Sequence, residues 1–161
     1  MIRIRPYLPT DSSGCLSIFD GNCPKYFDFS ERDAFAQWLS FQELPDKNTY
    51  SFSALERYYV VEDNDNQMVG CAGYYLTMDE KEARFAWGMI KRDQHLKGYG
   101  AAIAEFRLQE IKYKHPSAEI TLGTSQHSYE FYMGIGFEVL DIIPSGFAPK
   151  LDKYEMKFKG N

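Results

Sequence analysis

The stretch "HLKGYGAAIAEF" (residues 95–106) places two glycines, Gly98 and Gly100, directly before helix-forming sequence. The first N–H groups of a helix have no partner within it, and the helix dipole adds partial positive charge at that end. Glycine lacks the Cβ that would keep a ligand away from these groups. We therefore expect the amides of residues 97–102, helped by the Lys97 side chain, to form an anion site suited to phosphate.

Two nucleotide-binding motifs are excluded at this turn. No Gly-Lys-Ser/Thr follows the glycines, which rules out a Walker-type loop. A dinucleotide fingerprint needs a third glycine, but Ile103 stands there, and no suitable βαβ unit opens the chain. Because a bare Gly-x-Gly is also typical of a tight strand-to-helix turn without a ligand, neighbouring features must decide.

The strand predicted before the turn offers such a feature. In "EARFAWGMI" (82–90), alternation places Phe85, Trp87 and Met89 on one face and Ala86 and Gly88 on the other. Small residues leave a shallow surface on which a thin ligand could lie and bond the strand backbone. The alternative is that Ala86 and Gly88 only make room for a helix.

Composition indicates one folded domain spanning residues 1–161. Of the 161 residues, 44% are hydrophobic and 16% aromatic, enough for a sizeable core. The formal net charge is −5 and no basic stripe occurs, so we expect no nucleic-acid partner. The chain shows no signal-peptide core and no apolar run of bilayer length, so we expect a cytoplasmic protein without a membrane partner. The three cysteines lack CxxC spacing, which argues against a disulfide framework and a metal site.

The order of predicted elements indicates an α/β fold. Strands are predicted at 2–8, 57–63, 68–78, 82–90, 118–125, 137–143 and 153–159, and helices begin near Asp11, Ser30, Tyr99 and Ser128. Consecutive strands should pair antiparallel, and the two strands joined by the long helix should be parallel. The predicted fold is a mixed, mostly antiparallel sheet of six to seven strands flanked by helices on both faces. Ser30 is expected to cap its helix, and residues 144–152 are expected to form a loop.

Two motifs in this order resemble one family. "MIKRDQHLKGYGAAI" (89–103) resembles the acyl-CoA-binding signature of the GNAT superfamily of N-acetyltransferases, Q/R-x-x-G-x-G/A opening a helix. "SQHSYEFYMGIGFEVL" (125–140) resembles the second signature of that family, in which Tyr132, Gly136 and Phe137 match the tyrosine and the closing Gly-Phe. The element order is similar to that of the family over nearly the whole chain.

The resemblance implies a site for acetyl-CoA, which would serve as the acyl donor. It implies that the pyrophosphate is held by the amides of Leu96, Lys97, Gly98, Tyr99, Gly100 and Ala101. It also implies that the pantetheine arm pairs with Gly88, Met89 and Ile90. Two positions depart from the family pattern: His95 replaces the usual glutamine or arginine, and Ser125 replaces asparagine. His95 can still donate hydrogen bonds to the pyrophosphate, whereas the shorter Ser125 puts the contact to pantetheine in doubt.

The resemblance also implies the chemistry. The family transfers acetyl directly to an amine, with Tyr132 holding the position of the acid that protonates the leaving thiolate and the strand backbone near Met89 holding the oxyanion. Tyr129 lies near the same helical face, so either tyrosine could instead be packed. The general base is left open among the following neighbours of the predicted site: Glu56, Glu82, Arg84 and His127.

The acceptor side is less defined by sequence. Tyr26, Phe27 and Phe29 could line a pocket or fill the core, and Phe147 lies in a segment that could be a flap over the acceptor or an ordinary turn. The leading prediction is an N-acetyltransferase acting on a primary amine of a small molecule or peptide. The alternative is a non-catalytic acyl-CoA-binding or regulatory module on the same fold. Dimers are frequent in the family, so a homodimer is one expected assembly.

Overall fold

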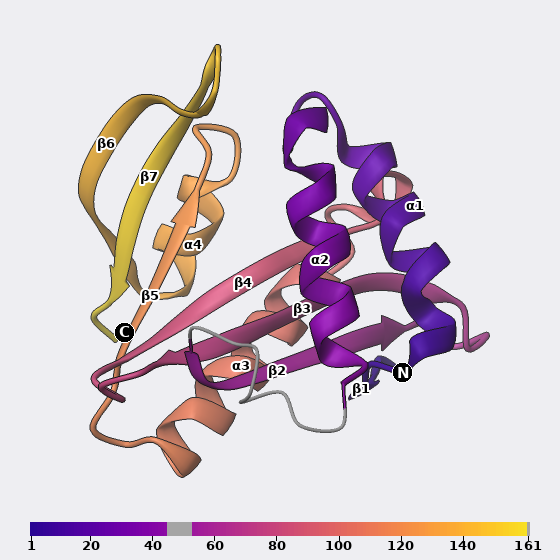
Figure 1. Ribbon diagram of the computed structural model, residues 1–161, viewed down its shortest axis with the longest axis horizontal. Coiled ribbons are helices and arrows are strands. Elements are labelled where there is room, and N and C mark those ends of the chain that lie inside the picture. Colours follow the sequence, from indigo (N-terminus) through magenta and orange to yellow (C-terminus); the bar gives the residue numbers. More distant parts are fainter. Residues whose placement is uncertain (45–52, 161) are drawn as a thin grey trace.

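Seven strands form one mixed sheet, in the order β1-β2-β3-β4-β5-β7-β6, in the computed structural model, which describes residues 1–44 and 53–160 (Figure 1). The strands are β1 (Arg3–Pro6), β2 (Ser53–Glu62), β3 (Met68–Thr77), β4 (Glu82–Ile90), β5 (Glu119–Thr124), β6 (Phe137–Ala148) and β7 (Leu151–Phe158). All neighbouring strands pair antiparallel except β4 and β5, which are parallel. The predicted fold class, including the parallel pair joined by the long helix, is confirmed.

Helices cover both faces of this sheet. Helices α1 (Ser12–Asn22) and α2 (Arg32–Gln42) lie side by side on one face, and α3 (Tyr99–Lys114) lies on the other (Figure 1). The short helix α4 (Tyr129–Ile135) packs beside β6. Within the described ranges, no helix has the length and apolar character needed to cross a bilayer.

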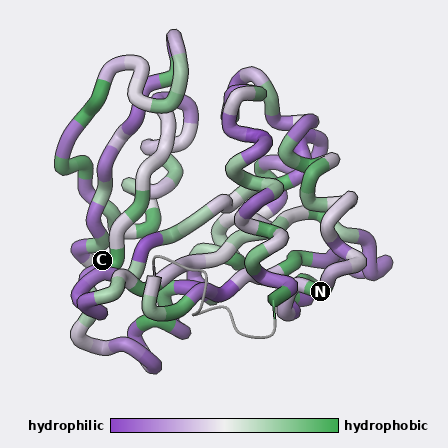
Figure 2. The backbone as a smooth tube through the Cα atoms, viewed as in Figure 1, coloured by the Kyte–Doolittle hydropathy of each residue, from purple (hydrophilic) through white to green (hydrophobic). Residues whose placement is uncertain are grey.

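Each face of the sheet has its own core. Along β2, Tyr58 and Val60 pack toward α1 and α2, whereas Tyr59 and Val61 pack toward α3, because successive side chains of a strand point to opposite faces. Both faces are therefore apolar at the centre of the sheet, and each fully buried side chain of this kind stabilises the fold by roughly 1.5–3 kcal/mol. Figure 2 shows hydrophobic and hydrophilic segments alternating along the helices, as expected for helices with one buried side.

The sheet opens between β4 and β5. Their parallel pairing is limited to residues 82–84 of β4 and residues 119–121 of β5. Beyond Arg84 the two strands diverge (Figure 1), so the β5-facing edge of β4 has no strand partner there. This split positions the functional site.

A bulge in β4 changes which residues share a face. Cys71 pairs with Met89 and Gly73 with Ala86, so two residues of β4 oppose a single residue of β3. Trp87, in the bulge, has a positive φ of 49°. As a result Phe85 packs in the core on the α3 side, while Trp87 and Met89 pack in the core on the α1–α2 side. The prediction that these three residues share a face was wrong, because simple alternation does not anticipate a bulge.

Two local predictions were also wrong. Asp28, not Ser30, supplies the capping side chain: its Oδ2 accepts the Ser30 N–H at 2.9 Å, in a 3₁₀ turn that precedes α2. The expected loop at 144–152 is instead the end of a β-hairpin, because β6 continues to Ala148 and β7 begins at Leu151. Pro144 suggested a loop, but β6 is an edge strand, where a proline can occupy a position that donates no ladder hydrogen bond.

Candidate active site

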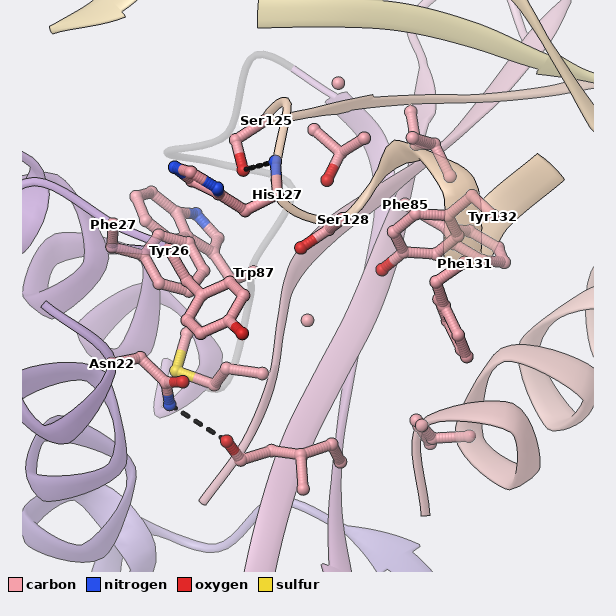
Figure 3. A pocket seen from close by; sticks show the side chains of 18 of the residues that line it. Asn22, Tyr26, Phe27, Phe85, Trp87, Ser125, His127, Ser128, Phe131 and Tyr132 are labelled. Atoms are coloured by element: carbon pink, nitrogen blue, oxygen red, sulfur yellow. Dashed lines mark hydrogen bonds between the residues drawn. The ribbon is translucent and has the colours of Figure 1, made fainter. Parts of the chain in front are cut away.

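A cavity of about 520 Å³ lies where β4 and β5 diverge (Figure 3). It extends from the turn before α3 to the β6–β7 hairpin and is walled on one side by the segment that joins α1 to α2. Most of the residues that the sequence predicts for the site line it: Gly88, Met89, Ile90, His95, Leu96, Gly98, Gly100, Ala101, Ser125 and Tyr132. Lys97 and Tyr99 do not line it.

The glycine turn has the conformation that an exposed helix start requires. Gly98 is the N-cap of α3 with φ 91°, a left-handed value that favours glycine. The first turn of α3 is closed by the bond from Ala102 N–H to Gly98 O at 3.1 Å, so the amides of residues 99–101 have no partner within the helix. At Gly100 a Cβ would lie 3.3 Å from the Phe131 ring, so glycine lets α3 approach α4 closely.

The side chains of Lys97 and Tyr99, in the glycine turn, contact other parts of the protein. Lys97 Nζ donates to Gln94 Oε1 at 3.3 Å, and Tyr99 packs against the core on the α3 side. These two residues therefore offer the cavity at most their backbone amides. Leu96 also has a positive φ of 63°, and its side chain is fully exposed.

His95 braces the end of β4. Its Nε2 lies 2.8 Å from the Ile90 carbonyl oxygen, and it must carry the proton because a carbonyl only accepts. The same oxygen accepts from Asn22 Nδ2 at 2.9 Å (Figure 3), and the His95 ring meets the edge of the Tyr26 ring at 5.1 Å. The Nε2 of His95 is therefore hydrogen-bonded within the protein, whereas the sequence predicts that His95 donates to the pyrophosphate.

Tyr132 reaches the cavity from α4. The start of this helix is organised by Ser125, whose Oγ accepts the His127 N–H at 3.2 Å and whose carbonyl oxygen accepts the Tyr129 N–H at 3.1 Å (Figure 3). Tyr132 is half-buried, with its ring 5.9 Å from that of Phe137 in an edge contact. Tyr129 instead stacks on Tyr154, with ring centroids 4.3 Å apart, and does not line the cavity. The structure therefore separates the two tyrosines that helical spacing left equivalent.

The far end of the cavity is aromatic. The rings of Phe27 and Trp87 are stacked with centroids 6.2 Å apart, and both residues line the cavity together with Tyr26 (Figure 3). Phe147, from the hairpin, closes this end. Of the three aromatic residues that the sequence singled out, Phe29 is exposed and takes no part.

Charged groups also line this end. Arg84 Nη2 and Lys153 Nζ both contact Glu155 Oε1, at 2.8 and 3.2 Å. Burial would lower the pKa of Arg84, but the hydrogen bond and charge of Glu155 outweigh it and raise that pKa. Glu31 lines the same end, and burial raises the pKa of its carboxyl group.

The four candidates for the general base are not equivalent. Glu56 accepts hydrogen bonds from Gln42 and Ser53, Glu82 accepts one from Thr121, and neither carboxylate lines the cavity. Arg84 lines it, but its raised pKa keeps it protonated, which removes it as a base. His127 lines the cavity beside Tyr26, with ring centroids 6.3 Å apart.

Among the charged residues that line the cavity, three were missed from sequence: Glu31, Arg107 and Lys153. Glu31 had a readable signal, because Asp28-x-x-Glu31 is a capping box in which Glu31 accepts the Asp28 N–H at 2.9 Å. Arg107 also had a signal in the sequence: it lies four residues from both Ile103 and Ile111, so helical spacing places it in the buried stripe of α3. Lys153 had no signal in the sequence, because the β6–β7 hairpin brings this residue to the cavity. In residues 1–44 and 53–160, no three His, Cys, Asp or Glu side chains gather in a way that could hold a metal ion.

Comparison with known proteins agrees with this geometry. The family model described as "Acetyltransferase (GNAT) domain" matches residues 28–146. The chain belongs to the GNAT acetyltransferase family. It is therefore an acyltransferase, and the resemblance drawn from the two motifs is confirmed. A sequence search of curated proteins finds no match.

Solved GNAT structures share the fold at low sequence identity. A protein assigned to the GNAT family from Desulfovibrio desulfuricans is 16% identical, with TM-score 0.77 and 99% of each chain covered. The ribosomal-protein-S18-alanine N-acetyltransferase of Escherichia coli is 18% identical, with TM-score 0.73, covering 98% of this chain and 93% of that one. Spermidine N-acetyltransferase from Vibrio cholerae, in complex with CoA and spermine, is 16% identical, with TM-score 0.74 and coverage of 98% and 94%. These likenesses support the fold alone.

Proposed function

We propose that this GNAT enzyme transfers an acetyl group from acetyl-CoA to a primary amine of a small molecule or peptide by direct attack. The observation that carries the proposal is the single cavity that connects the exposed helix start at Gly98 and Gly100 with Tyr132 through the split in the sheet. We also propose that residues 1–161 act as one acetyltransferase domain. This is supported by similar structures that cover 98–99% of the chain.

Acetyl-CoA would bind along the main chain of β4 and of the turn before α3. The pyrophosphate would lie on the amides of residues 96–101, where N–H groups and the helix dipole favour an anion. The pantetheine arm would follow β4 from Ile90 to Gly88, along the edge that β5 leaves unpaired. This path brings the thioester to the bulge, between Gly88 and Tyr132, which both line the cavity.

The chemical step would use few protein groups. The neutral amine attacks the thioester carbonyl carbon, and a backbone N–H near Met89 donates to the oxyanion. Collapse releases the CoA thiolate, to which Tyr132 gives a proton. The amine proton passes to water, and Glu31 and His127, which both line the cavity, are the candidates to accept it.

The test is CoA release from acetyl-CoA with a panel of amines that includes polyamines, aromatic amines and peptides with a free amino terminus. Amine-dependent thiol release, with an N-acetylated product seen by mass spectrometry, is the expected result. Saturable CoA binding without release for any amine would favour a non-catalytic module, and absence of CoA binding by calorimetry would overturn the proposal.

A further inference from the structure

Arg107 on α3 holds a guanidinium inside the protein. Arg107 is only 2% exposed to solvent. Nη1 donates to the Gly73 carbonyl oxygen at 3.0 Å, Nε donates to the Ile103 carbonyl oxygen at 3.3 Å, and the guanidinium lies 3.8 Å from the centroid of the Phe85 ring. Within the described residues, no carboxylate forms an ion pair with it.

Stability alone does not account for a cation at this position. Burying a charge is costly unless it is paired, and apolar side chains of similar volume often serve a buried site better. Burial lowers the pKa of Arg107, and its interaction with the Tyr132 hydroxyl offsets this only in part. The neighbouring members of the buried stripe, Ile103 and Ile111, are apolar. An anion that is present only during function would explain the charge.

The guanidinium is placed where such an anion would form. Arg107 lines the cavity beside Gly88: a Cβ built on Gly88 would lie 3.4 and 3.5 Å from its two terminal nitrogens. Tyr132 also lines the cavity, and its hydroxyl raises the pKa of the same guanidinium. A glycine at 88 therefore leaves no side chain between the guanidinium and the strand that we expect to carry the thioester.

We propose that Arg107 stabilises the negative charge released when the thioester breaks, first on the sulfur of CoA and then on Tyr132. This inference rests on the proposed function. The amine nitrogen bonds to the carbonyl carbon, and collapse of the tetrahedral intermediate breaks the carbon–sulfur bond and leaves the electron pair on sulfur. The Tyr132 proton moves to sulfur, which leaves a phenolate. The proton lost by the amine then returns to Tyr132 through water, and the guanidinium faces the charge throughout.

The test compares R107M with R107K. Methionine fills the apolar site without charge, and lysine keeps the charge but fits less well. We expect kcat to fall by about 100-fold in R107M, as for the loss of one preorganised donor, and the KM for acetyl-CoA to change little. R107K should retain more activity than R107M, although R107M should melt at the same or a higher temperature. A purely structural role predicts the opposite order of activities. K112M removes a cation of α3 that does not line the cavity and is the matched control.

A binding experiment needs no acceptor. Calorimetry with CoA and desulfo-CoA, repeated at increasing pH, should show that wild-type protein increasingly prefers CoA as its thiol ionises, and that R107M loses this preference. Should R107M not fold, R107A with millimolar guanidinium chloride replaces it, and recovery of kcat supports the proposal.

The outcomes separate the two proposals. A folded R107M with wild-type kcat and wild-type preference for CoA overturns the role of Arg107 and leaves the proposed function intact. A folded R107A that guanidinium does not restore also counts against that role. Wild-type protein that binds no CoA overturns the proposed function and this inference with it.

Discussion

The end of the cavity at the start of α3 is lined largely by backbone, whereas the end at the β6–β7 hairpin is lined by side chains from distant parts of the chain. At the first end, Gly98 and Gly100 expose amides within one short segment. At the second, Phe27, Glu31 and Lys153 meet only because the sheet and two helices bring them together. Under the proposed function, the backbone end would bind the acetyl donor and the side-chain end would select the acceptor.

The largest effect is expected where the two ends meet. Y132F keeps the ring that packs against Phe137 and removes only the hydroxyl proton. We expect kcat to fall by about 100-fold, the usual contribution of a general acid, and CoA affinity to stay within about threefold. The measurements are steady-state kinetics and calorimetry. Y129F is the matched control, because Tyr129 stacks on Tyr154 outside the cavity. Equal losses in both variants would contradict the assignment.

A smaller effect should mark the backbone end. Gly98 and Gly134 both have open space where a Cβ would lie, but only Gly98 has a positive φ. G98A should cost roughly 1–2 kcal/mol, shared between unfolding free energy and CoA binding, because alanine disfavours the left-handed conformation. G134A should be neutral or stabilise the helix by about 0.4–1 kcal/mol. If the two variants bind CoA equally and unfold alike, the conformation of the turn does not matter to the donor.

The side-chain end should respond only in acceptor kinetics. F147A removes an aromatic wall, and we expect the acceptor KM to rise by about three- to tenfold, since part of a phenyl contact worth roughly 1.5–3 kcal/mol is lost. The KM for acetyl-CoA should not change. The control is F29A, which truncates an exposed phenylalanine outside the cavity. A rise in the acetyl-CoA KM instead would show that the two ends are not separate.

The smallest effect concerns Glu31. Burial raises the pKa of its carboxyl group, so the folded state holds this proton more tightly than the unfolded state. Stability linked to this group is therefore greatest at low pH and declines as the pH rises through the folded pKa. E31Q does not titrate, so the difference in unfolding free energy, E31Q minus wild type, should grow more positive toward neutral pH. Urea denaturation at several pH values measures this difference, and a constant difference would contradict the raised pKa of the half-buried carboxyl group.

Sequence by itself determined the element order and the backbone end of the site. β4 has the predicted bounds and α3 begins at the predicted residue, because their apolar patterns and the glycines that separate them are local signals. Gly98 and Gly100 were predicted from local signals of the same kind, whereas Tyr132 was predicted from the resemblance of a few adjacent residues to a family motif.

Only the tertiary structure decided which side chains share the cavity. The bulge at Trp87 moves Phe85 to the opposite face, the hairpin carries Phe147 and Lys153 to the wall of the cavity, and His95 turns to the Ile90 carbonyl. Arg107 was not singled out from the sequence, and only packing places it beside Gly88 and Tyr132. Backbone conformation at a turn is set by residues that are neighbours in sequence, whereas the partners of a side chain are set by strands and helices that meet only after folding.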